Sequence, residues 1–499
     1  MRFGIIIAVI LFEIITTVAA GIYVNCKAKA SGQGNSFAVG GRSLGTWAVG
    51  TTICLICLGS GHTTGTMEGA YSIGLSQVWH TMGNGIALSL AAVTTFIWAR
   101  RLRITSLGDV LTTLYGRGLT VCVAAVNIAV GWGVCSCETQ AMGVVINALT
   151  GWNLKTAVIA GTIIGFLYII IGGMEQSAIL NQFNIVLLYG GLGIALLYIV
   201  HGLGTGGLEN VREYYVSAGQ SDMLRFTGAP GFLLKVGLPT LLAPFFCNIC
   251  GQQTMQVAAS AKSENAVRRI AYFVGPMNCI IGGISATFAI IAKSLPQYAE
   301  LDAKVISVRM LVDMLPNWLI TLVLAAFLAA LLSSFGGFVM GPATIIANDF
   351  IKAYFKPNMT TKEESRWIRV GVVIGTIICG ILAQMLPPVI EMMTWLFAFM
   401  APTFFLVVYG LWWKRSNIVG TGTFLIVWLI ANIWTFTDLK YVIGMGNVDM
   451  LYIILVLSVV LPIIGNCIFK TKQGYFHSDE WKQSEEYRLY QKDKHEGRA

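Results

Sequence analysis

Apolar segments of about twenty residues recur along the whole 499-residue chain, and they constrain its fold more than any other feature. A helix of about that length crosses the roughly 30 Å hydrocarbon core of a bilayer. The chain is 56% hydrophobic and only 11% charged, whereas soluble proteins carry roughly 25% charged residues. Membrane β-barrels show alternating segments of about ten residues instead. We therefore predict an all-α polytopic membrane protein.

The apolar segments define thirteen expected spans. The first ends in TTVAAG, whose small residues also fit a signal-peptide cleavage site, so that alternative stays open. The expected spans are 3–25, 46–76, 78–99, 118–149, 155–173, 177–203, 231–259, 270–293, 317–351, 367–386, 388–413, 417–437 and 449–469.

The distribution of basic residues predicts the orientation, because Lys and Arg gather in cytoplasmic loops. With the N-terminus outside and the C-terminus in the cytoplasm, 24 of the 33 Lys and Arg face inward. The net charge of +9 therefore reflects topology in a cell membrane, and no nucleic-acid partner is expected. The eleven cysteines lie mostly inside spans at irregular spacing, which indicates packing residues and not a disulfide framework.

Two spans contain stretches that are poor helix formers. CLGSGHTTGT (57–66) brings three glycines and several hydroxyls into the second span, and GLPTLLAPFFCNICGQQTMQ (237–256) brings prolines, a glycine and a polar run into the seventh. In lipid, unpaired backbone groups cost several kcal/mol each, so such breaks persist only beside protein or a water-filled cavity. Freed carbonyls at a break can bind a cation. The alternative is a glycine-rich packing face against a neighbouring helix.

The positions of the two breaks predict how the chain is organised. Spans two to six and seven to eleven form two sets of five, each of which begins with an interrupted helix. Matching interruptions indicate an inverted repeat with a binding site near the bilayer midplane. The expected divisions are 1–45 (extra helix and inner loop), 46–203 (first repeat), 204–230 (outer loop), 231–415 (second repeat), 416–469 (two C-terminal helices) and 470–499 (cytoplasmic tail, expected to be mobile, solvated or on the membrane surface).

Five stretches, in order, resemble the sodium:solute symporter family of LeuT-type fold, over about Phe37 to Arg415. They are FAVGGRSLGTWAVG, ITSLGDVLTTLYG, GGMEQSAILNQFN, GQQTMQVAASAKSENAVRR and AAFLAALLSSFGGFVMGPATIIANDFIK. The resemblance implies a LeuT-type 5+5 inverted repeat and secondary active symport with Na⁺ as the co-transported ion. It implies no enzymatic activity, and a monomer in the lipid bilayer is expected.

The resemblance also implies a sodium site between the first and eighth core helices. Its ligands would be the backbone carbonyls of Leu55, Leu58 and Ala330 and the hydroxyls of Ser333 and Ser334. Sodium, a hard cation, prefers such oxygen ligands. Taken alone, the two serines would be helix-packing residues. Many members carry an aspartate where this chain has Asn181, a position linked to coupling, so we expect one sodium per cycle.

GSGHTTGTMEGAY (59–71) resembles the choline-transporter branch, but a quaternary ammonium requires an aromatic cage. Cys57 and Gly251 occupy the positions that would supply the cage tryptophans, so the resemblance does not extend to choline. The solute-binding candidates are polar or aromatic residues near the breaks or on the third and tenth core helices: His62, Thr63, Asn248, Gln252, Gln253, Trp132, Glu138, Gln140 and Trp395.

Glu138 allows two interpretations. An ionisable residue within a span is a functional candidate, and in the cavity it would favour a cationic or zwitterionic solute. Otherwise it is a carboxylate bonded to a neighbouring helix, and His62 with the half-helix amides would suit a carboxylate solute. Asp349 is expected to pair with Lys352. The alternatives to sodium-driven import are a proton-coupled carrier of the same fold and a transporter-like solute sensor.

Overall fold

The computed structural model describes residues 42–170, 173–298, 300–385, 389–446 and 448–496, together with Gly4, residues 11–12 and 15–24, and Cys26. Among these described residues, nine helices are long and apolar enough to cross a membrane, and Ile15–Val24, Thr46–Cys57 and Leu154–Ile170 form shorter apolar helices. This set is compatible with thirteen spans without fixing that count. Most of residues 1–41, including much of the first expected span, lies outside the described residues.

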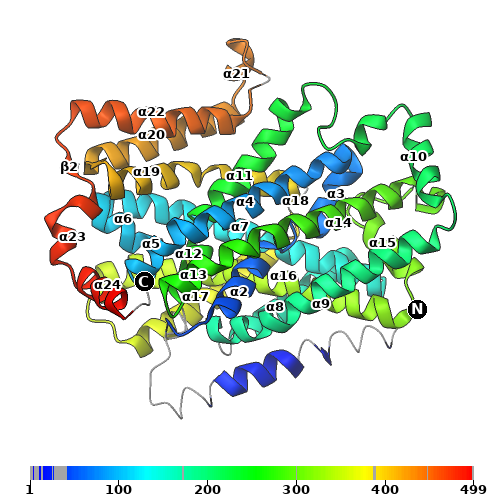
Figure 1. Cartoon of the computed structure of the whole chain (residues 1–499), viewed down its shortest axis with the longest axis horizontal. Coiled ribbons are helices and arrows are strands. Elements are labelled where there is room, and N and C mark those ends of the chain that lie inside the picture. Colours follow the sequence, from blue (N-terminus) through cyan, green and yellow to red (C-terminus); the bar gives the residue numbers. More distant parts are fainter. Residues whose placement is uncertain are drawn as a thin grey trace.

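The first half of the chain is a series of helices that lie roughly along the long axis of the molecule (Figure 1). They are α2 (Thr46–Cys57), α3 (Thr64–Ile73), η2 (Gly74–Gln77), α4 (Val78–Val93), α5 (Thr95–Arg101), α6 (Leu107–Tyr115), α7 (Arg117–Thr150), α8 (Leu154–Ile170) and α9 (Gly173–Gly202). A polar connection follows, with α10 (Gly207–Ser217) and η3 (Ser221–Leu224).

The second half repeats this helical pattern. It comprises η4 (Leu233–Gly237), α11 (Leu238–Ile249), α12 (Gln252–Ala259), α13 (Glu264–Arg268), η5 (Arg269–Tyr272), α14 (Val274–Ser294), η6 (Pro296–Tyr298), α15 (Ile306–Met314), α16 (Asn317–Ile345), η7 (Ile346–Phe355), α17 (Thr361–Leu382), α18 (Val389–Ala398) and α19 (Ala401–Trp412). The C-terminal part adds β1 (Lys414–Arg415), α20 (Asn417–Phe436), α21 (Leu439–Val442), α22 (Met450–Ile468), β2 (Lys472–Gln473), η8 (Tyr475–His477), α23 (Asp479–Gln483) and α24 (Glu485–His495).

The core helices pack as two groups. In one, α4 packs against α11 and α14, and α14 also contacts α2 and α3. In the other, α7, α8, α16 and α17 pack against one another. The broken pair α2–α3 lies between them, because α2 contacts α16 and α9 as well as its own group. A movement of one group against the other would therefore act on this broken helix.

Both predicted breaks are present. α2 ends at Cys57 and α3 begins at Thr64, and α11 ends at Ile249 and α12 begins at Gln252. Gly251, the N-cap of α12, has extended backbone angles (φ −76°, ψ 146°). Between α2 and α3 the chain forms turns, in which the amides of His62 and Thr63 both donate to the Gly59 carbonyl (3.2 Å each). A further interruption, which the sequence analysis does not anticipate, separates α18 from α19 at residues 399–400.

The two breaks are bordered by a direct link between the halves of the chain. The segment entering α2 and the segment leaving α12 lie side by side, because the Leu44 amide donates to the Ser260 carbonyl (3.1 Å) and the Lys262 amide donates to the Leu44 carbonyl (2.9 Å). Leu44 and Ala261 form an isolated parallel bridge. The guanidinium of Arg42 fixes the same region by donating to the Ala259 carbonyl (3.1 Å).

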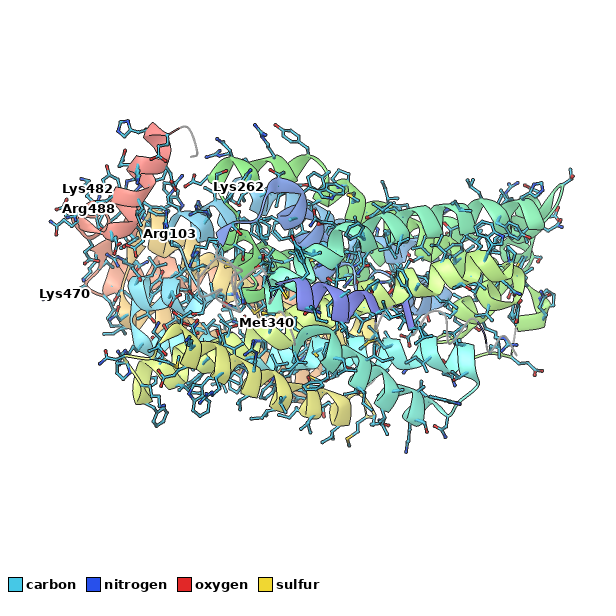
Figure 2. All side chains as sticks on the ribbon, turned by 90° about the horizontal axis from the view of Figure 1, so that it is seen from below. Arg103, Lys262, Met340, Lys470, Lys482 and Arg488 are labelled. Atoms are coloured by element: carbon cyan, nitrogen blue, oxygen red, sulfur yellow. The ribbon has the colours of Figure 1, made fainter. Side chains whose placement is uncertain are left out.

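The two ends of the molecule differ. α10 and α15 lie at one end, here called the α10 end, and α23 and α24 lie at the other, here called the tail end (Figure 1). Lys470, Lys482 and Arg488 gather near Arg103 at the tail end, whereas Met340 lies in the middle (Figure 2). Basic residues from distant parts of the sequence thus share one end.

The tail, which is expected to be mobile, solvated or on the membrane surface, packs against the rest of the protein through its first part, whereas α24 has no buried residues. β2 pairs antiparallel with β1, and Tyr475 and Trp481 are buried. The Asp493 carboxylate lies 3.9 Å from Arg100 and 3.6 Å from Arg103. This first part is not fully solvated because its aromatic residues pack on an apolar surface at Trp412, which lies edge-on against Phe476.

The pairing expected for Asp349 is also corrected. Its carboxylate accepts a 2.6 Å hydrogen bond from the hydroxyl of Ser106, and no ion pair with Lys352 occurs within the described part of the chain. η7, which carries Asp349, has π-helical geometry. This change of helical period shifts the side chain directions relative to a regular α-helix.

Candidate functional site

The first break and α16 are joined by a serine. The hydroxyl of Ser334 donates to the carbonyls of Leu55 (3.1 Å) and Ile56 (2.6 Å), at the end of α2. Ser333 and Ser334 are both fully buried, and the Ser333 hydroxyl has no hydrogen-bond partner among the described residues. Helix carbonyls at a C-terminal end carry partial negative charge. Oxygen atoms from two helices therefore converge where the sequence analysis expects the sodium site, with Ile56 as the second carbonyl in contact.

A carboxylate from a third helix reaches the same place. Glu138 on α7 is 1% exposed, and its Oε2 accepts from the backbone amide of Ser60 (2.8 Å) while Oε1 accepts from the Ser60 hydroxyl (2.9 Å). A side chain at position 59 would displace these groups, since a Cβ there would lie 2.3 Å from Ser334 Oγ and 2.4 and 2.5 Å from the two Glu138 oxygens. The Ser334 hydroxyl and the Glu138 carboxylate therefore both lie beside the Cα of Gly59.

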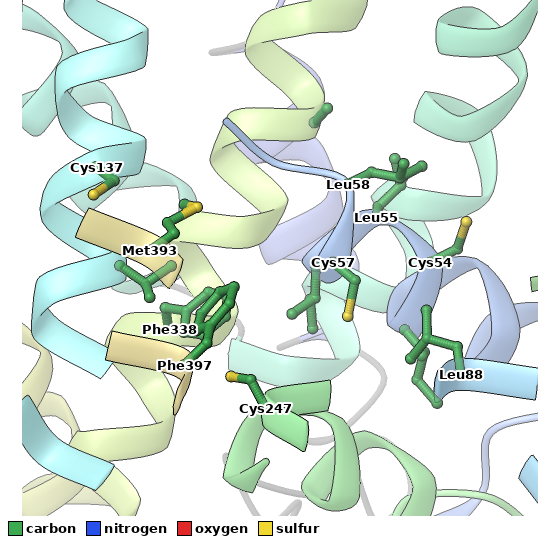
Figure 3. Close-up of a cluster of buried hydrophobic side chains, with 14 of the residues drawn as sticks. Cys54, Leu55, Cys57, Leu58, Leu88, Cys137, Cys247, Phe338, Met393 and Phe397 are labelled. Atoms are coloured by element: carbon green, nitrogen blue, oxygen red, sulfur yellow. The ribbon is translucent and has the colours of Figure 1, made fainter. Parts of the chain in front are cut away.

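A small cavity of about 20 Å³ adjoins this point, which is room for roughly one water or a bare ion. Phe338, Met393 and Phe397 gather on one side of it and Cys57 lies across from them (Figure 3). The full lining comprises Ile56, Cys57, Gly59, Gly61, His62, His80, Asn84, Val134, Glu138, Asn248, Phe338, Met393 and Phe397.

Polar side chains form one wall of the cavity. Asn84 Nδ2 lies 3.0 Å from His62 Nε2 and donates to the Cys57 carbonyl (3.0 Å). The rings of His62 and His80 contact edge-on, with centroids 5.7 Å apart. The Cys57 thiol donates to Asn248 Oδ1 (3.2 Å), which connects the first break to α11 just before the second break.

The remaining predicted solute residues divide among several places. The hydroxyl of Thr63 donates a hydrogen bond to the Gly59 carbonyl within the first break. Gln252 accepts from the Leu107 amide (2.6 Å) and donates to the Thr105 carbonyl (3.3 Å), so it connects α12 to the start of α6.

Three further candidates lie outside the cavity lining. The Trp132 ring packs beside Gly375 of α17, and Trp395 lines a pocket toward the α10 end. Gln140 is buried on α7. The coupling candidate Asn181 is buried on α9, with its Oδ1 accepting from Tyr168 (3.4 Å) and its Nδ2 donating to Ser177 (3.3 Å).

Sequence reasoning missed part of the polar wall. His80 and Asn84 are four residues apart in the third expected span and lie on one face of α4. Two polar residues with i,i+4 spacing in an apolar helix indicate a shared polar face, and this signal could have identified them. Phe338, Met393 and Phe397 give no such signal, because aromatic and thioether side chains are ordinary in a membrane helix.

Larger pockets flank the cavity at both ends. Toward the α10 end, a pocket of about 800 Å³ is lined by Glu68, Lys304, Trp395, Lys440 and other residues. Toward the tail end, a pocket of about 580 Å³ is lined by residues of α6 and η7, with Tyr475 and Glu486 of the tail. The small central cavity therefore lies between these two larger pockets.

Comparison with known proteins identifies the chain's relatives. The model of the sodium:solute symporter family matches residues 37–427. The chain is 25% identical over 434 residues to high-affinity choline transporter 1 of Drosophila melanogaster, covering 83% of this chain and 64% of the relative, so it spans slightly less than two thirds of that protein. It is also 25% identical over 421 residues to the sodium/pantothenate symporter of Escherichia coli (strain K12), covering 79% and 82%.

The fold agrees with that family. A Na⁺-coupled sialic acid symporter, solved substrate-bound in an outward-open state, superposes with a TM-score of 0.75 at 15% identity, covering 94% of this chain and 99% of the other. This likeness confirms the predicted LeuT-type fold, and the relatives are transporters and not enzymes. The chain belongs to the sodium:solute symporter family.

Proposed function

We propose that this protein is a sodium-coupled symporter that moves a small organic solute across the membrane by alternating access. The observation that carries the proposal is the contact between the Ser334 hydroxyl and the carbonyls of Leu55 and Ile56. It brings hydroxyl and carbonyl oxygens from the two groups of helices together at a break. A cation bound there would hold α2 against α16 and so control how the groups move.

The pockets support alternating access. The central cavity of about 20 Å³ is too small for an organic solute, so this arrangement corresponds to a site that is closed between two larger spaces. Rocking of the α4–α11–α14 group against the α7–α8–α16–α17 group would widen the cavity toward one end at a time. We propose that the α10 end faces outward and the tail end faces the cytoplasm, which agrees with the basic residues gathered there.

Sodium can supply enough energy for import. One charge crossing a membrane potential of about 100 mV yields about 2.3 kcal/mol, and about 1.4 kcal/mol corresponds to a tenfold ratio. The voltage alone therefore sustains a solute gradient on the order of fiftyfold.

The cavity lining narrows the solute class. Glu138 accepts a hydrogen bond from the Ser60 amide and places a carboxylate in the cavity lining. An anionic solute would therefore be repelled by a charge of the same sign. His62, Asn84 and Asn248 offer hydrogen bonds on one wall, and Phe338, Met393 and Phe397 offer apolar contact on the other. We propose a neutral or zwitterionic solute with one polar and one apolar part.

The test combines a screen with transport. Thermal-shift measurements of the purified protein with amino acids, amines and small carboxylates, with and without Na⁺, identify the solute, whose uptake is then measured in proteoliposomes. We expect Ser334→Ala to weaken sodium dependence at least tenfold. Ser285→Ala, which changes a buried serine of α14, should behave as wild type. Unaltered sodium-driven uptake in Ser334→Ala would refute the site.

A proton-coupled carrier is the second candidate, because Glu138 and His62 both line the cavity. It predicts uptake at acid pH in the absence of sodium, driven by a pH gradient alone. Sodium-dependent uptake that is insensitive to that gradient excludes it.

A further inference from the structure

We propose that Glu138 is a ligand of the transported cation, so that the sodium site between α2 and α16 contains a full negative charge from α7. This inference rests on the proposed function and adds the charge of the site to it. The sodium ligands that the family resemblance implies are all neutral and lie near the first break or on α16. Glu138 is not among them, because it comes from α7. The position of Gly59 is the central observation, because the oxygens of Ser334 and Glu138 face the same point next to its Cα.

The surroundings of Glu138 give it hydrogen bonds but no counter-charge. Both carboxylate oxygens accept hydrogen bonds from Ser60, one from the amide and one from the hydroxyl. No Lys, Arg or His forms an ion pair with Glu138 in the described part of the chain, and the cavity lining offers only the two histidines, His62 and His80, as basic groups. Burying a charge is costly unless it is paired as well as hydrogen-bonded, and a cation at the break would supply the missing counter-charge.

The neighbouring groups suit a hard cation. The end of α2 presents carbonyl oxygens with partial negative charge, and Ser334 adds a hydroxyl that already contacts two of them. The Ser333 hydroxyl, fully buried, is without a partner among the described residues. The adjoining cavity has room for an ion and not for an organic ammonium group with its substituents. Carboxylate, hydroxyl and carbonyl oxygens are the ligands that hard cations prefer.

Glu138 also connects the two groups of helices through the ion. It lies on α7, which packs with α16, while Ser60 lies in the break between α2 and α3. Sodium bound between them would pull the broken helix toward α7 and α16 together. The carboxylate therefore couples ion binding to the position of the break as well as raising cation affinity.

The experiment measures sodium binding without any solute. The full-length protein is titrated with NaCl against N-methyl-D-glucamine chloride at constant ionic strength, and the melting temperature gives the sodium concentration for half-maximal stabilisation. In Glu138→Gln, which keeps the shape and removes the charge, we expect that concentration to rise at least tenfold. Glu138→Asp, which keeps the charge one methylene further back, should give a smaller rise and covers the case in which the glutamine variant does not fold.

Glu68→Gln is the matched control. Glu68 is a buried carboxylate on α3, but it lines the pocket toward the α10 end and not the central cavity, so its removal should leave the sodium midpoint unchanged. An unchanged midpoint in Glu138→Gln overturns the inference and leaves the proposed function standing; lost uptake alongside it would assign Glu138 to the solute. Absence of any sodium stabilisation in the wild type overturns both.

Discussion

The hydroxyl of Ser106, at the N-terminus of α6, donates a 2.6 Å hydrogen bond to the carboxylate of Asp349 on η7. This bond joins the two halves of the chain at the tail end. Gln252 reinforces it by accepting from the amide of Leu107, one residue further on. Together these contacts hold α6 against η7 and α12, and we expect them to close the path between the central cavity and the tail-end pocket.

Ser106→Ala should open this closure. A hydrogen bond to a charged group contributes about 1.5–3 kcal/mol, so its loss shifts the population of the open state by about tenfold or more. Cys247, buried beside Gln252 and Gln253 in a closed space of about 10 Å³, reports the opening. Its rate of modification by a small maleimide, followed by mass spectrometry, should rise accordingly. Cys379, buried on α17, should react as slowly as in the wild type, and equal acceleration at both cysteines would indicate general unfolding.

Gly59→Ala should disrupt the proposed sodium site by steric conflict. The added methyl group would lie within 2.5 Å of Ser334 Oγ and both Glu138 oxygens, and overpacking of this kind costs about 1–3 kcal/mol. We expect a lower melting temperature and loss of stabilisation by sodium. Gly190→Ala on α9, where nothing lies within 4 Å of the new Cβ, is the control. Normal sodium stabilisation in Gly59→Ala would argue against convergence of these groups on the ion.

Asn181 predicts the stoichiometry. It is neutral and buried, with Tyr168 and Ser177 as its partners. We therefore expect one sodium per solute, measured as the ratio of ²²Na⁺ to labelled solute taken up, with a Hill coefficient near one. Asn181→Asp introduces a carboxylate at this position and should raise that coefficient. A ratio of two in the wild type would contradict this interpretation.

The docking of the tail should depend on pH. Hydrogen bonds from Arg415 (2.5 Å) and Lys472 (3.0 Å) lower the pKa of Glu480 below its ordinary value. A lowered pKa in the docked state means that this contribution is present above the ordinary glutamate pKa and is lost as the pH falls through the lowered value. Limited proteolysis should therefore release residues after Phe469 faster at acid pH.

Glu480→Gln should show that faster cleavage already at neutral pH. Glu485→Gln, at an exposed carboxylate of α24, should not. If Glu480→Gln is cleaved at the wild-type rate at every pH, the contact with Arg415 does not hold the tail.

The orientation is testable with a fusion. A green fluorescent protein fused after the last residue should fluoresce, and one inserted near Gly219 between α10 and η3 should not, because the first is expected in the cytoplasm and the second outside. The opposite pattern would reverse the direction of transport in the proposal.

The sequence identified features that depend on local chemistry. Gly59 and Gly61 predict the break after Cys57, and Gly251 predicts the break before Gln252, because glycine weakens a helix wherever it occurs. Ser334 was found through its motif and not through its chemistry, since a lone buried serine commonly packs against a helix.

The sequence did not reveal features that depend on which helices become neighbours. Glu138 could be assigned to a span, but only the packing of α7 beside the first break shows that its carboxylate reaches Gly59 and Ser60. The tail was expected to be solvated because its charge is visible in the sequence, whereas the apolar surface around Trp412 that receives it is created by folding.

The bridge between Leu44 and Ala261 has a mechanical consequence. The strand-like stretch leading into one discontinuous helix is tied to the stretch emerging from the other, so neither can swing away alone while these bonds hold. Tilting of α2 would thereby be transmitted to α12 through the backbone bridge itself. In the proposed transport cycle the two half-helices would therefore move together about this bridge, which lies at the cytoplasmic end in the proposed orientation, and a solute bound between them would contact both at once.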